Sequence, residues 1–419
     1  MRSISNQLDM QKISGPSGGC PVDHSKSGQR KTARTAEPQK PPINQDNSGV
    51  WHVMGFEEAR AILRSGDTKQ AGFRAEMIEQ IPRMMNLPIL YLEGKPHQSQ
   101  RRQTARFFTP KTVSSNYQKL MEQQAEALIE TLKREKQADL SKLSLVMAVR
   151  VAGKVVGLTD SLIPGMAKRL EAFFEQGTGD MTLSWRPDVI FRLLKNQWRV
   201  GAFYLFDVWP AIRKRRKQPQ EDVITHLIEQ HYKNTEILTE CVTYGAAGMV
   251  TTREFISVAT WHLLEQPALR ERYLKGSDAE RHAILEEILR LEPVVGHLFR
   301  RAKADLHLES EGQHIIIPQN ALIDLHIYAE NADEKVVGDT GLELCPGRKL
   351  QGEKIPAELM SFGDGHHRCP GSYVAIQETD IFLRRLLALE NLRVVAGPDL
   401  SWNDLTMGYE IRDFIIAVD

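Results

Sequence analysis

Much of the chain repeats hydrophobic residues every three or four positions, which is the spacing of amphipathic helices. This pattern covers residues 56–64, 115–134, 140–156 and 162–176. Residues 236–265 are apolar on nearly all sides and predict a buried helix, roughly 45 Å long at about 1.5 Å per residue. Short alternating segments predict strands at 50–53, 306–308, 314–317 and 322–327, with a last pair near 392–395 and 411–418. The pattern therefore predicts a mainly α fold with a small β-sheet region.

The beginning of the chain differs in composition from the rest. Residues 1–46 are rich in Ser, Gly, Pro, Lys and Gln and poor in large apolar residues, so we expect a disordered tail there and a single domain over residues 47–419. No stretch is long and apolar enough to cross a bilayer, and the N-terminus lacks the apolar core of a secretory signal. We therefore expect a cytoplasmic protein without a membrane anchor.

Charge and cysteine usage narrow the class of protein further. The 54 Lys and Arg residues balance the 54 Asp and Glu residues, so no net charge favours nucleic acid as a partner. The four cysteines lie too far apart in the sequence to suggest a disulfide framework, and this suits a reducing compartment; they are Cys20, Cys241, Cys345 and Cys369.

The loop over residues 362–371 carries the strongest chemical pattern, Phe-Gly-Asp-Gly-His-His-Arg-Cys-Pro-Gly. Its glycines permit backbone conformations that residues with a Cβ avoid. Cys369 lies between them with His367 and Arg368 beside it, a positive setting that favours the thiolate. One thiolate without a second cysteine nearby fits an axial haem ligand better than a zinc site. The alternative is a buried structural cysteine in a turn.

This loop resembles the haem loop of the cytochromes P-450, the haem-thiolate monooxygenases, which reads Phe-Gly-x-Gly-x-His-x-Cys-x-Gly. Every fixed place of that pattern is filled, by Phe362, Gly363, Gly365, His367, Cys369 and Gly371. The resemblance extends from about residue 50 to the end and is to the soluble bacterial type. It implies a haem b (iron protoporphyrin IX) held between the long central helix and the cysteine loop. Cys369 would bind the iron, and its thiolate would favour O–O cleavage.

Basic residues elsewhere match positions that bind the haem propionates in this family. His97 and Arg101 are four apart, so on a helix they share a face. A solvated basic face is the common explanation, but the family has His-x-x-x-Arg here. Arg300 matches a further propionate ligand, with Arg301 as its alternative. With Phe362, Ala247 and Gly248, the resemblance implies a cofactor-binding set of Cys369, His97, Arg101, Arg300, His367, Phe362, Ala247 and Gly248.

The centre of the predicted buried helix reads Gly-Ala-Ala-Gly at residues 245–248. Each glycine lowers the stability of a helix by roughly 1 kcal/mol relative to alanine. The presence of two glycines therefore requires an explanation, either close packing against another helix or space for a flat cofactor. The family pattern here is Ala/Gly-Gly-x-acid-Thr, and the resemblance implies that Thr251 is catalytic and helps to deliver protons. Val250 departs from the pattern, since valine cannot act as an acid. Glu254 could relay protons instead; the other options are help from the substrate, slow and leaky turnover, or the use of peroxide.

One carboxylate lies on the apolar stripe of a helix that opens with a capping box at residues 277–280. Glu287 falls on that stripe, and a buried charge must be paired. Arg290 follows three residues later, and the resemblance to a Glu-x-x-Arg motif implies a third member, for which Arg348 is the candidate. We assign these three residues to structure rather than chemistry.

The remaining expectations concern substrate and partners. The apolar segment 81–92 and the aromatic and basic segment 181–209 resemble the parts of the family that cover the substrate pocket, and residues 213–217 read as a solvated linker. The side of Arg101, Arg102 and Arg106, with Lys111, would receive a ferredoxin or flavodoxin-type electron donor.

The resemblance thus implies a monomeric monooxygenase that uses O2 and electrons from NAD(P)H, passed on by redox partners, to oxidise an apolar small molecule. Two alternatives stay open. A peroxide-driven hydroxylase is motivated by Val250, and a haem-binding sensor or carrier without turnover is the alternative from another class.

Overall fold

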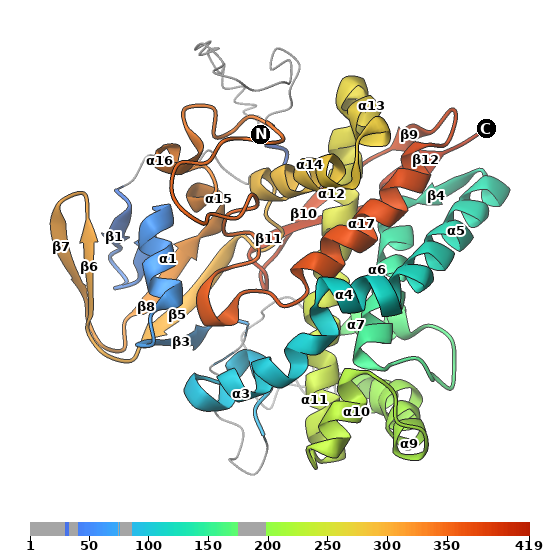
Figure 1. Cartoon of the computed structure of the whole chain (residues 1–419), viewed down its shortest axis with the longest axis horizontal. Coiled ribbons are helices and arrows are strands. Elements are labelled where there is room, and N and C mark those ends of the chain that lie inside the picture. The colour runs from blue at the N-terminus through green and yellow to red at the C-terminus, as the bar shows by residue number, and fades with distance from the viewer. Residues whose placement is uncertain (1–29, 33–40, 74, 76–85, 175–197) are drawn as a thin grey trace, which may run out of the picture.

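The computed structural model describes residues 30–32, 41–73, 75, 86–174 and 198–419. Most of the predicted tail, most of the aromatic and basic segment 181–209 and part of the apolar segment 81–92 lie outside these residues. Figure 1 shows a larger helical region beside a smaller region of sheet. The prediction of a mainly α fold with a small β-sheet region is confirmed.

The hydrophobic core of the larger region lies between long helices. The helices predicted over 115–134, 140–156 and 162–176 are present as α5, α6 and α7. Helices α5 and α6 bury the apolar face that the pattern predicted, and Leu170 of α7 is buried. The helices of this region are α3 (Gly94–Thr104), α4 (Pro110–Thr112), α5 (Gln118–Glu135), α6 (Leu140–Val156), α7 (Met166–Phe174), α9 (Trp209–Lys217), α10 (Val223–Glu229), α11 (Asn234–Gly245), α12 (Thr251–Glu265), α13 (Pro267–Lys275), α14 (Asp278–Leu291) and α17 (Ser372–Leu387), with the turns η1 (Ile89–Tyr91), η2 (Ala105–Phe108), η3 (Val113–Tyr117) and η4 (Tyr204–Val208).

The smaller region is built on a five-stranded sheet whose order is β1-β2-β8-β5-β3. Helix α1 (Phe56–Arg64) packs its apolar side against one face of this sheet. The strands are β1 (Ile43–Gln45), β2 (Trp51–Val53), β3 (Thr68–Ala71), β5 (His297–Ala302) and β8 (Leu322–His326). The smaller sheets pair β6 (Leu306–Ser310) with β7 (Gln313–Ile317), β10 (Asp399–Asn403) with β11 (Gly408–Arg412), and β12 (Ile415–Ala417) with β4 (Gln137–Asp139) and β9 (Arg393–Ala396); α15 (Ile327–Glu330) and α16 (Glu334–Val337) follow β8.

The predicted long buried helix is present as a continuous run from α11 through η5 (Ala246–Val250) to α12. Its middle turn is π-helical, a feature that the periodicity did not reveal. A π-helical turn inside an α-helix is frequently found at functional sites, although η3 and η4 of this protein are also π-helical. The wider turn coincides with the alanine and glycine residues that the sequence analysis singled out.

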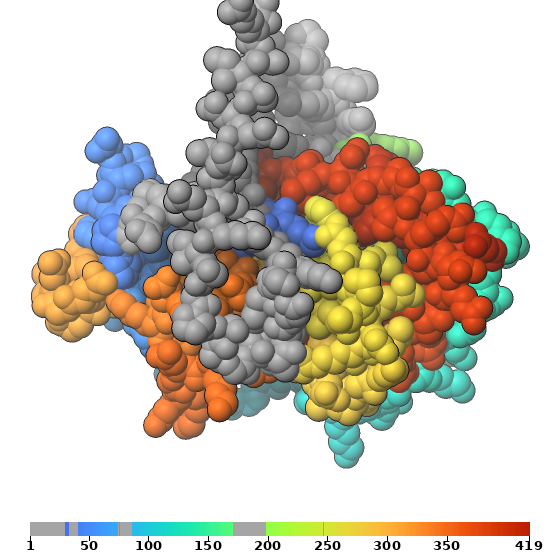
Figure 2. Space-filling view, turned by 90° about the horizontal axis from the view of Figure 1, so that it is seen from above, coloured from blue at the N-terminus to red at the C-terminus, as the bar shows by residue number. Residues whose placement is uncertain are grey.

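The start of the ordered chain lies earlier than predicted. Ile43–Gln45 falls inside the expected tail of residues 1–46, yet it pairs with β2 and buries Ile43. Residues 30–32 also contact the folded region, since Thr32 Oγ1 donates to Glu292 Oε2 at 2.5 Å; they form the small blue group near the centre of Figure 2. The boundary at residue 46 is therefore wrong, because a three-residue strand carries too little pattern to be recognised.

The basic run at residues 213–217 is not a solvated linker, so this prediction is wrong. It forms the end of α9, and Arg215 is buried. Arg215 pairs with Asp160 and with Asp222, each at 2.5 Å, which satisfies the requirement that a buried charge be paired. The sequence alone could not distinguish the one inward-facing arginine from its exposed neighbours.

Two further observations concern the cysteines and membranes. Cys241 and Cys369 are free, whereas Cys345 is disulfide-bonded, so the expectation that disulfides are absent is wrong at Cys345. None of the helices in the described ranges combines the length and the apolar character that spanning a bilayer requires.

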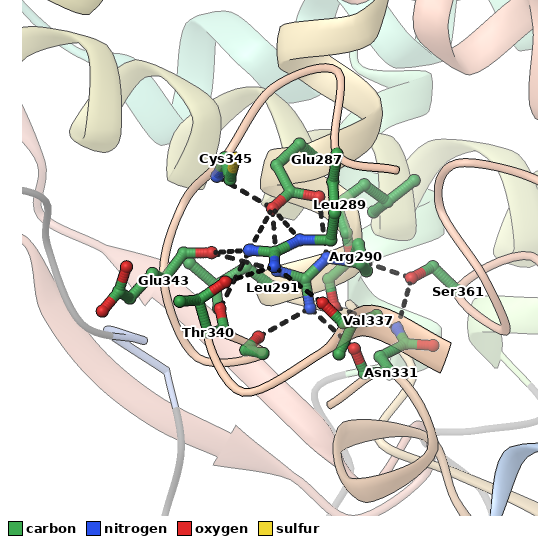
Figure 3. A network of polar contacts seen from close by, with 12 residues as sticks. Glu287, Leu289, Arg290, Leu291, Asn331, Val337, Thr340, Glu343, Cys345 and Ser361 are labelled. Atoms are coloured by element: carbon green, nitrogen blue, oxygen red, sulfur yellow. Dashed lines mark hydrogen bonds and ion pairs between the residues drawn. The ribbon is translucent and has the colours of Figure 1, made fainter. Parts of the chain in front are cut away.

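The predicted pairing of Glu287 with Arg290 and Arg348 is confirmed (Figure 3). Glu287 accepts bidentate bonds from Arg290 at 2.7 and 2.8 Å, and its Oε1 also accepts from Arg348 at 3.3 Å and from the backbone N–H of Cys345 at 2.9 Å. The helix that carries Glu287 opens with the predicted capping box at Ser277. The network therefore holds the segment after α16 against α14.

Further hydrogen bonds connect this network to the cysteine loop. Arg290 donates to the carbonyl oxygen of Asn331 at 2.6 Å, and the Asn331 side chain accepts from the backbone N–H of Met360 and donates to Ser361 Oγ, both at 2.8 Å. Ser361 in turn donates to the carbonyl oxygen of Leu289 at 2.8 Å. The start of the cysteine loop, at Met360 and Ser361, is thus hydrogen-bonded both to Asn331 and to Leu289 of α14.

We expect Glu287→Gln to lower the free energy of unfolding by about 3–5 kcal/mol, because two buried arginines would lose their counter-charge without any change of side-chain size. The urea midpoint, followed by circular dichroism, measures this loss. The matched control is Glu271→Gln, which breaks an exposed pair with Lys275 and should leave the midpoint unchanged. Equal midpoints for the two variants would contradict the assignment.

Candidate active site

The loop before α17 presents Cys369 close to the start of that helix. Gly363 and Gly365 have positive φ angles of 66° and 64°. A Cβ at Gly365 would lie 2.1 Å from the carbonyl oxygen of Leu63 in α1, so a larger residue would not fit. The backbone N–H of Cys369 donates to the carbonyl oxygen of Phe362 at 2.9 Å and closes the loop. The prediction that glycines shape this loop is confirmed at these two positions.

The surroundings of the Cys369 thiol differ from the prediction of a setting that favours the thiolate. Burial raises the pKa of the thiol above its ordinary value, and it outweighs the lowering by the Gly371 backbone N–H, Arg101 and Arg368. Two cations and one N–H group are therefore present, but their effect is smaller than that of desolvation. Binding of a metal ion deprotonates such a thiol outright.

Three of the predicted propionate ligands line one pocket. His97 comes from α3, Arg300 from β5 and His367 from the turn η6 (Gly365–His367), with Glu93 among the other lining residues. The rings of His97 and His367 are stacked with their centroids 4.1 Å apart. The structure therefore brings together residues that are more than two hundred positions apart in the sequence.

Arg101 lies apart from this pocket, against the cysteine loop. It donates to the carbonyl oxygen of Arg368, and its charge is one of the influences on the Cys369 thiol. Arg101 is half-buried, so its charge is partly shielded from water. The helical spacing predicted correctly that His97 and Arg101 share a side of α3, but each reaches a different part of the site.

The pocket brings together nitrogen groups from His97, Arg300 and His367 with the carboxylate of Glu93. Burial lowers the pKa of His97 to about 4, and His367 and Arg101 lower it further, so this imidazole is neutral at pH 7. Burial also lowers the pKa of Arg300 to about 10, at which the guanidinium stays protonated at pH 7, and Glu93 is the one carboxylate that opposes this shift. A buried guanidinium with imidazole groups beside it fits a bound group that carries carboxylates, as haem does with its two propionates. The donor set therefore fits the cofactor that the sequence implied.

The opposite wall of the site is the π-helical turn of the central helix. Ala247 is exposed and Thr251 is half-buried, although Met249 and Val250 between them are buried. One side of the helix is consequently open in the middle of a buried run. An open side that bears only a small residue leaves room for a flat group, which agrees with the placement predicted for Ala247.

Gly248 faces a different neighbour. A Cβ at Gly248 would lie 3.4 Å from Ala152 Cβ in α6, and a Cβ at Gly245 would lie 3.3 Å from Leu170 Cδ2 in α7. Close helix packing, one of the two explanations considered for these glycines, therefore accounts for both. Contact between Gly248 and a cofactor would have to involve its backbone.

The hydroxyl of Thr251 donates to the carbonyl oxygen of Ala247 at 2.5 Å, one turn earlier. Its neighbour Val250 is buried and carries no titratable group. Glu254 cannot replace the missing acid, and this prediction is wrong. Its carboxylate is buried and accepts hydrogen bonds from Arg253 and Arg412 at 2.8 Å and from the backbone N–H of Ile411 at 2.7 Å. These bonds tie Glu254 to β11.

Sequence reasoning missed a second buried carboxyl, Glu378 in α17. Burial raises its pKa well above the ordinary value, and the hydroxyl of Thr252 opposes this shift only in part. Its Oε2 atom has no hydrogen-bond partner among the described residues. The available signal was a glutamate inside an apolar helical run, the same feature that identified Glu287.

Comparison with known proteins shows which family this chain is similar to. Residues 282–399 match the family model described as Cytochrome P450, and these residues include Glu287, Arg300 and Cys369. The chain is 24% identical over 359 residues to the biotin biosynthesis cytochrome P450 of Bacillus subtilis, covering 84% of this chain and 85% of that protein. It is also 24% identical over 359 residues to the erythromycin C-12 hydroxylase of Saccharopolyspora erythraea, covering 84% of each.

Solved structures share the fold. The crystal structure of P450BioI in complex with an acyl carrier protein that bears hexadec-9Z-enoic acid superposes with a TM-score of 0.71 at 21% identity. The superposition covers 90% of this chain and 95% of that one. At this level of identity the likeness establishes the architecture, and the site residues rest on the geometry described above.

We expect Glu378→Gln to change how stability depends on pH. With a raised pKa, the wild-type carboxyl contributes stability that is complete below its ordinary pKa of 4.5 and is lost as the pH rises toward the folded-state value. Glutamine does not titrate, so the free energy of unfolding of the variant should rise relative to that of the wild type by about 1.4 kcal/mol for each unit of increasing pH within that range. Thermal midpoints between pH 5 and 9 measure this. Glu390→Gln, at an exposed position, is the control; parallel curves for Glu378→Gln and wild type would refute the shift.

Proposed function

Because this chain belongs to the cytochrome P450 family of haem-thiolate monooxygenases, we propose that it inserts one oxygen atom of O2 into an apolar small organic molecule. The electrons would come from NAD(P)H through a ferredoxin or flavodoxin-type partner. The proposed enzyme works as a monomer in the cytoplasm. The observation that carries the proposal is a free cysteine at the end of a glycine loop, together with a pocket lined by His97, Arg300 and, from the same loop, His367.

Each part of the site has a role in this proposal. Cys369 Sγ would ligate the iron of haem b, with the backbone N–H of Gly371 as a hydrogen-bond donor to the sulfur. His97, Arg300 and His367 would bind the propionates. With a thiolate ligand, the bound haem supplies the chemistry of O2 activation. Phe362, Ala247 and the backbone of Gly248 would bound the cofactor.

The residues of the central helix limit how protons reach the reaction. The Thr251 hydroxyl donates its hydrogen bond to the Ala247 carbonyl oxygen, so its lone pairs are free to accept a hydrogen bond from a bound group. Val250 provides no acid, and Glu254 is engaged by two arginines. Glu378 remains as a buried carboxyl that retains its proton beside Thr252. We propose Thr251 as the catalytic residue.

The ligands of related proteins support an apolar substrate. P450BioI was solved with a fatty acyl chain on an acyl carrier protein, and a P450 EryK mutant with erythromycin B. In this chain, Ile89 of the segment predicted to line the pocket is buried, and its backbone N–H donates to Glu240 at 3.0 Å. We propose a substrate of similar character, a lipid-like, terpenoid, steroid or aromatic molecule.

Two rival functions can be separated from this one by experiment. The lack of an acid at Val250, together with the engagement of Glu254, favours a peroxide-driven hydroxylase as the second candidate. Product formation with hydrogen peroxide but not with a reduced ferredoxin would select that candidate. Spectral binding of ligands without product under any donor would select a sensor or carrier, and NADH-linked product formation would exclude it.

The thiolate ligand is tested by Cys369→Ala. We expect this variant to lose the thiolate-type Soret band of the reduced protein treated with carbon monoxide, because its iron would have lost the sulfur ligand. Cys241→Ala is the matched control, since Cys241 is also a free and buried cysteine but lies in the core of α11. Persistence of the thiolate spectrum in Cys369→Ala would overturn the proposed function.

Charge reversal tests which surface of this protein binds the electron donor. Arg102, Arg106 and Lys111 are exposed on the side of α3 and α4. We expect Arg102→Glu together with Arg106→Glu to raise the KM for an acidic ferredoxin at least tenfold, and the wild-type KM to rise with salt.

Peroxide-driven turnover needs no docking and should stay unchanged in this variant. Arg134→Glu, in the exposed last turn of α5, serves as a control for a charge change elsewhere on the surface. A KM that responds equally to both changes would place the donor elsewhere.

A further inference from the structure

Four polar side chains share one face of the five-stranded sheet. Strand register places His52 of β2 opposite Asp324 of β8, and His297 of β5 opposite His326 of β8. Side chains two positions apart on a strand point to the same side, so Asp324 and His326 share a face and their partners join them. Their neighbours of opposite parity, among them Leu325, belong to the core under α1. The polar group therefore lies on the face of the sheet that α1 does not cover.

We propose that His52, Asp324 and His326 form a binding site for a divalent metal ion of the zinc type. The three ligand atoms form a nearly regular triangle. His52 Nδ1 lies 2.9 Å from His326 Nε2 and 3.3 Å from Asp324 Oδ2, and His326 Nε2 lies 3.2 Å from the same oxygen. Tetrahedral ligands at about 2.0–2.1 Å from zinc are about 3.3 Å apart, so the triangle needs little adjustment to accept an ion.

The surrounding contacts are those that hold metal ligands in place. The second ring nitrogen of His52, Nε2, lies 3.2 Å from Asp46 Oδ2. The second oxygen of Asp324, Oδ1, lies 2.7 Å from His297 Nδ1. Ligating histidines usually bond a carboxylate through the nitrogen that does not bind the metal, and ligating carboxylates are themselves hydrogen-bonded. Both kinds of contact are present here.

Asp46 is itself well fixed. Its Oδ1 accepts hydrogen bonds from the backbone N–H of Ser48 and of Val50, both at 2.9 Å, and from Ser48 Oγ at 2.7 Å. These bonds close the turn between β1 and β2. The position of His52 is consequently set by a hairpin, and a metal ion would attach this hairpin to β8.

The ligand set suits particular ions. Two imidazole nitrogens and one carboxylate oxygen, with further positions open, are typical of Zn²⁺ and also accept Ni²⁺ and Cu²⁺. The side chains of His52 and His326 are 19% and 21% exposed and that of Asp324 is 8% exposed, so the site is accessible from solvent while its carboxylate is sheltered. None of these residues takes part in the proposed haem site.

Zinc titration of the full-length, haem-loaded protein tests the proposal. After treatment with a chelator and dialysis, the protein is titrated with ZnCl2 in a calorimeter, and its thermal midpoint is followed in parallel. We expect one equivalent of zinc to bind with a Kd in the micromolar range or tighter. The midpoint should rise with zinc concentration, because a ligand that binds the folded state stabilises it.

Variants assign the binding to this site. His52→Gln and His326→Gln should each weaken zinc binding at least tenfold, and Asp46→Asn, which removes an outer contact, should weaken it about ten- to a hundredfold. The matched control is His307→Ala. His307 and His314 form an exposed histidine pair on the β6–β7 hairpin with ring nitrogens 3.1 Å apart, so this change removes a rival pair of imidazoles.

The far-ultraviolet circular dichroism spectrum of each variant reports whether it is folded, independently of zinc and of haem. Loss of the site in His52→Gln and His326→Gln, with binding retained in His307→Ala, would support the proposal. Absence of micromolar binding in the wild type would overturn it. So would binding that survives in folded His52→Gln and His326→Gln, or that is lost in His307→Ala. None of these outcomes depends on monooxygenase activity, so the two proposals fail separately.

Discussion

The hydrogen bonds to one carboxylate oxygen, Glu287 Oε1, hold together the segments that support the cysteine loop. It accepts hydrogen bonds from Arg290, Arg348 and the backbone N–H of Cys345, all of them in or beside the core. A carboxylate buried this deeply must be paired, and the two arginines that pair it also bind backbone carbonyl oxygens between residues 331 and 343. Through Asn331 the same bonds reach the beginning of the cysteine loop. Glu287 is therefore connected by hydrogen bonds to the start of the loop that carries Cys369.

Burial of charge also explains the chemistry of the site. His97, Arg300 and His367 converge on one pocket, and Glu93 is the carboxylate that faces them there. Burial lowers the pKa of His97 and of Arg300, but Arg300 stays protonated at neutral pH, and this buried cation makes the pocket favourable for an anionic group. The Cys369 thiol experiences the opposite effect, because its neutral form is the one that burial favours. A cofactor that has both a metal ion and carboxylates would supply the anionic groups that the pocket favours and the metal ion that deprotonates the thiol.

Proton supply is the point at which this chain differs from the pattern that its central helix otherwise follows. Valine occupies the acid position at residue 250, and the glutamate one turn later is neutralised by Arg253 and Arg412. Glu378 is different, because it is buried without a cation among the groups that shift its pKa. The helix therefore offers a hydroxyl at Thr251, whereas the Glu378 carboxyl comes from α17 and lies beside Thr252. The lack of an acid at Val250 gives the peroxide-driven alternative its physical basis.

The sequence by itself determined the features that depend on the spacing of residues along the chain. The helical periodicity gave the long helices, the capping box gave the start of α14, and a charge on an apolar stripe revealed Glu287 with its partners. The loop pattern predicted Cys369 as the haem ligand and indicated the resemblance to the cytochromes P-450. Only the tertiary structure decided which way single side chains turn. It placed Arg215 inside, turned Glu254 toward β11 and set Gly248 against α6. It also gathered His52, Asp324 and His326, because strand register follows from pairing between distant segments and leaves no trace in the spacing of any one strand.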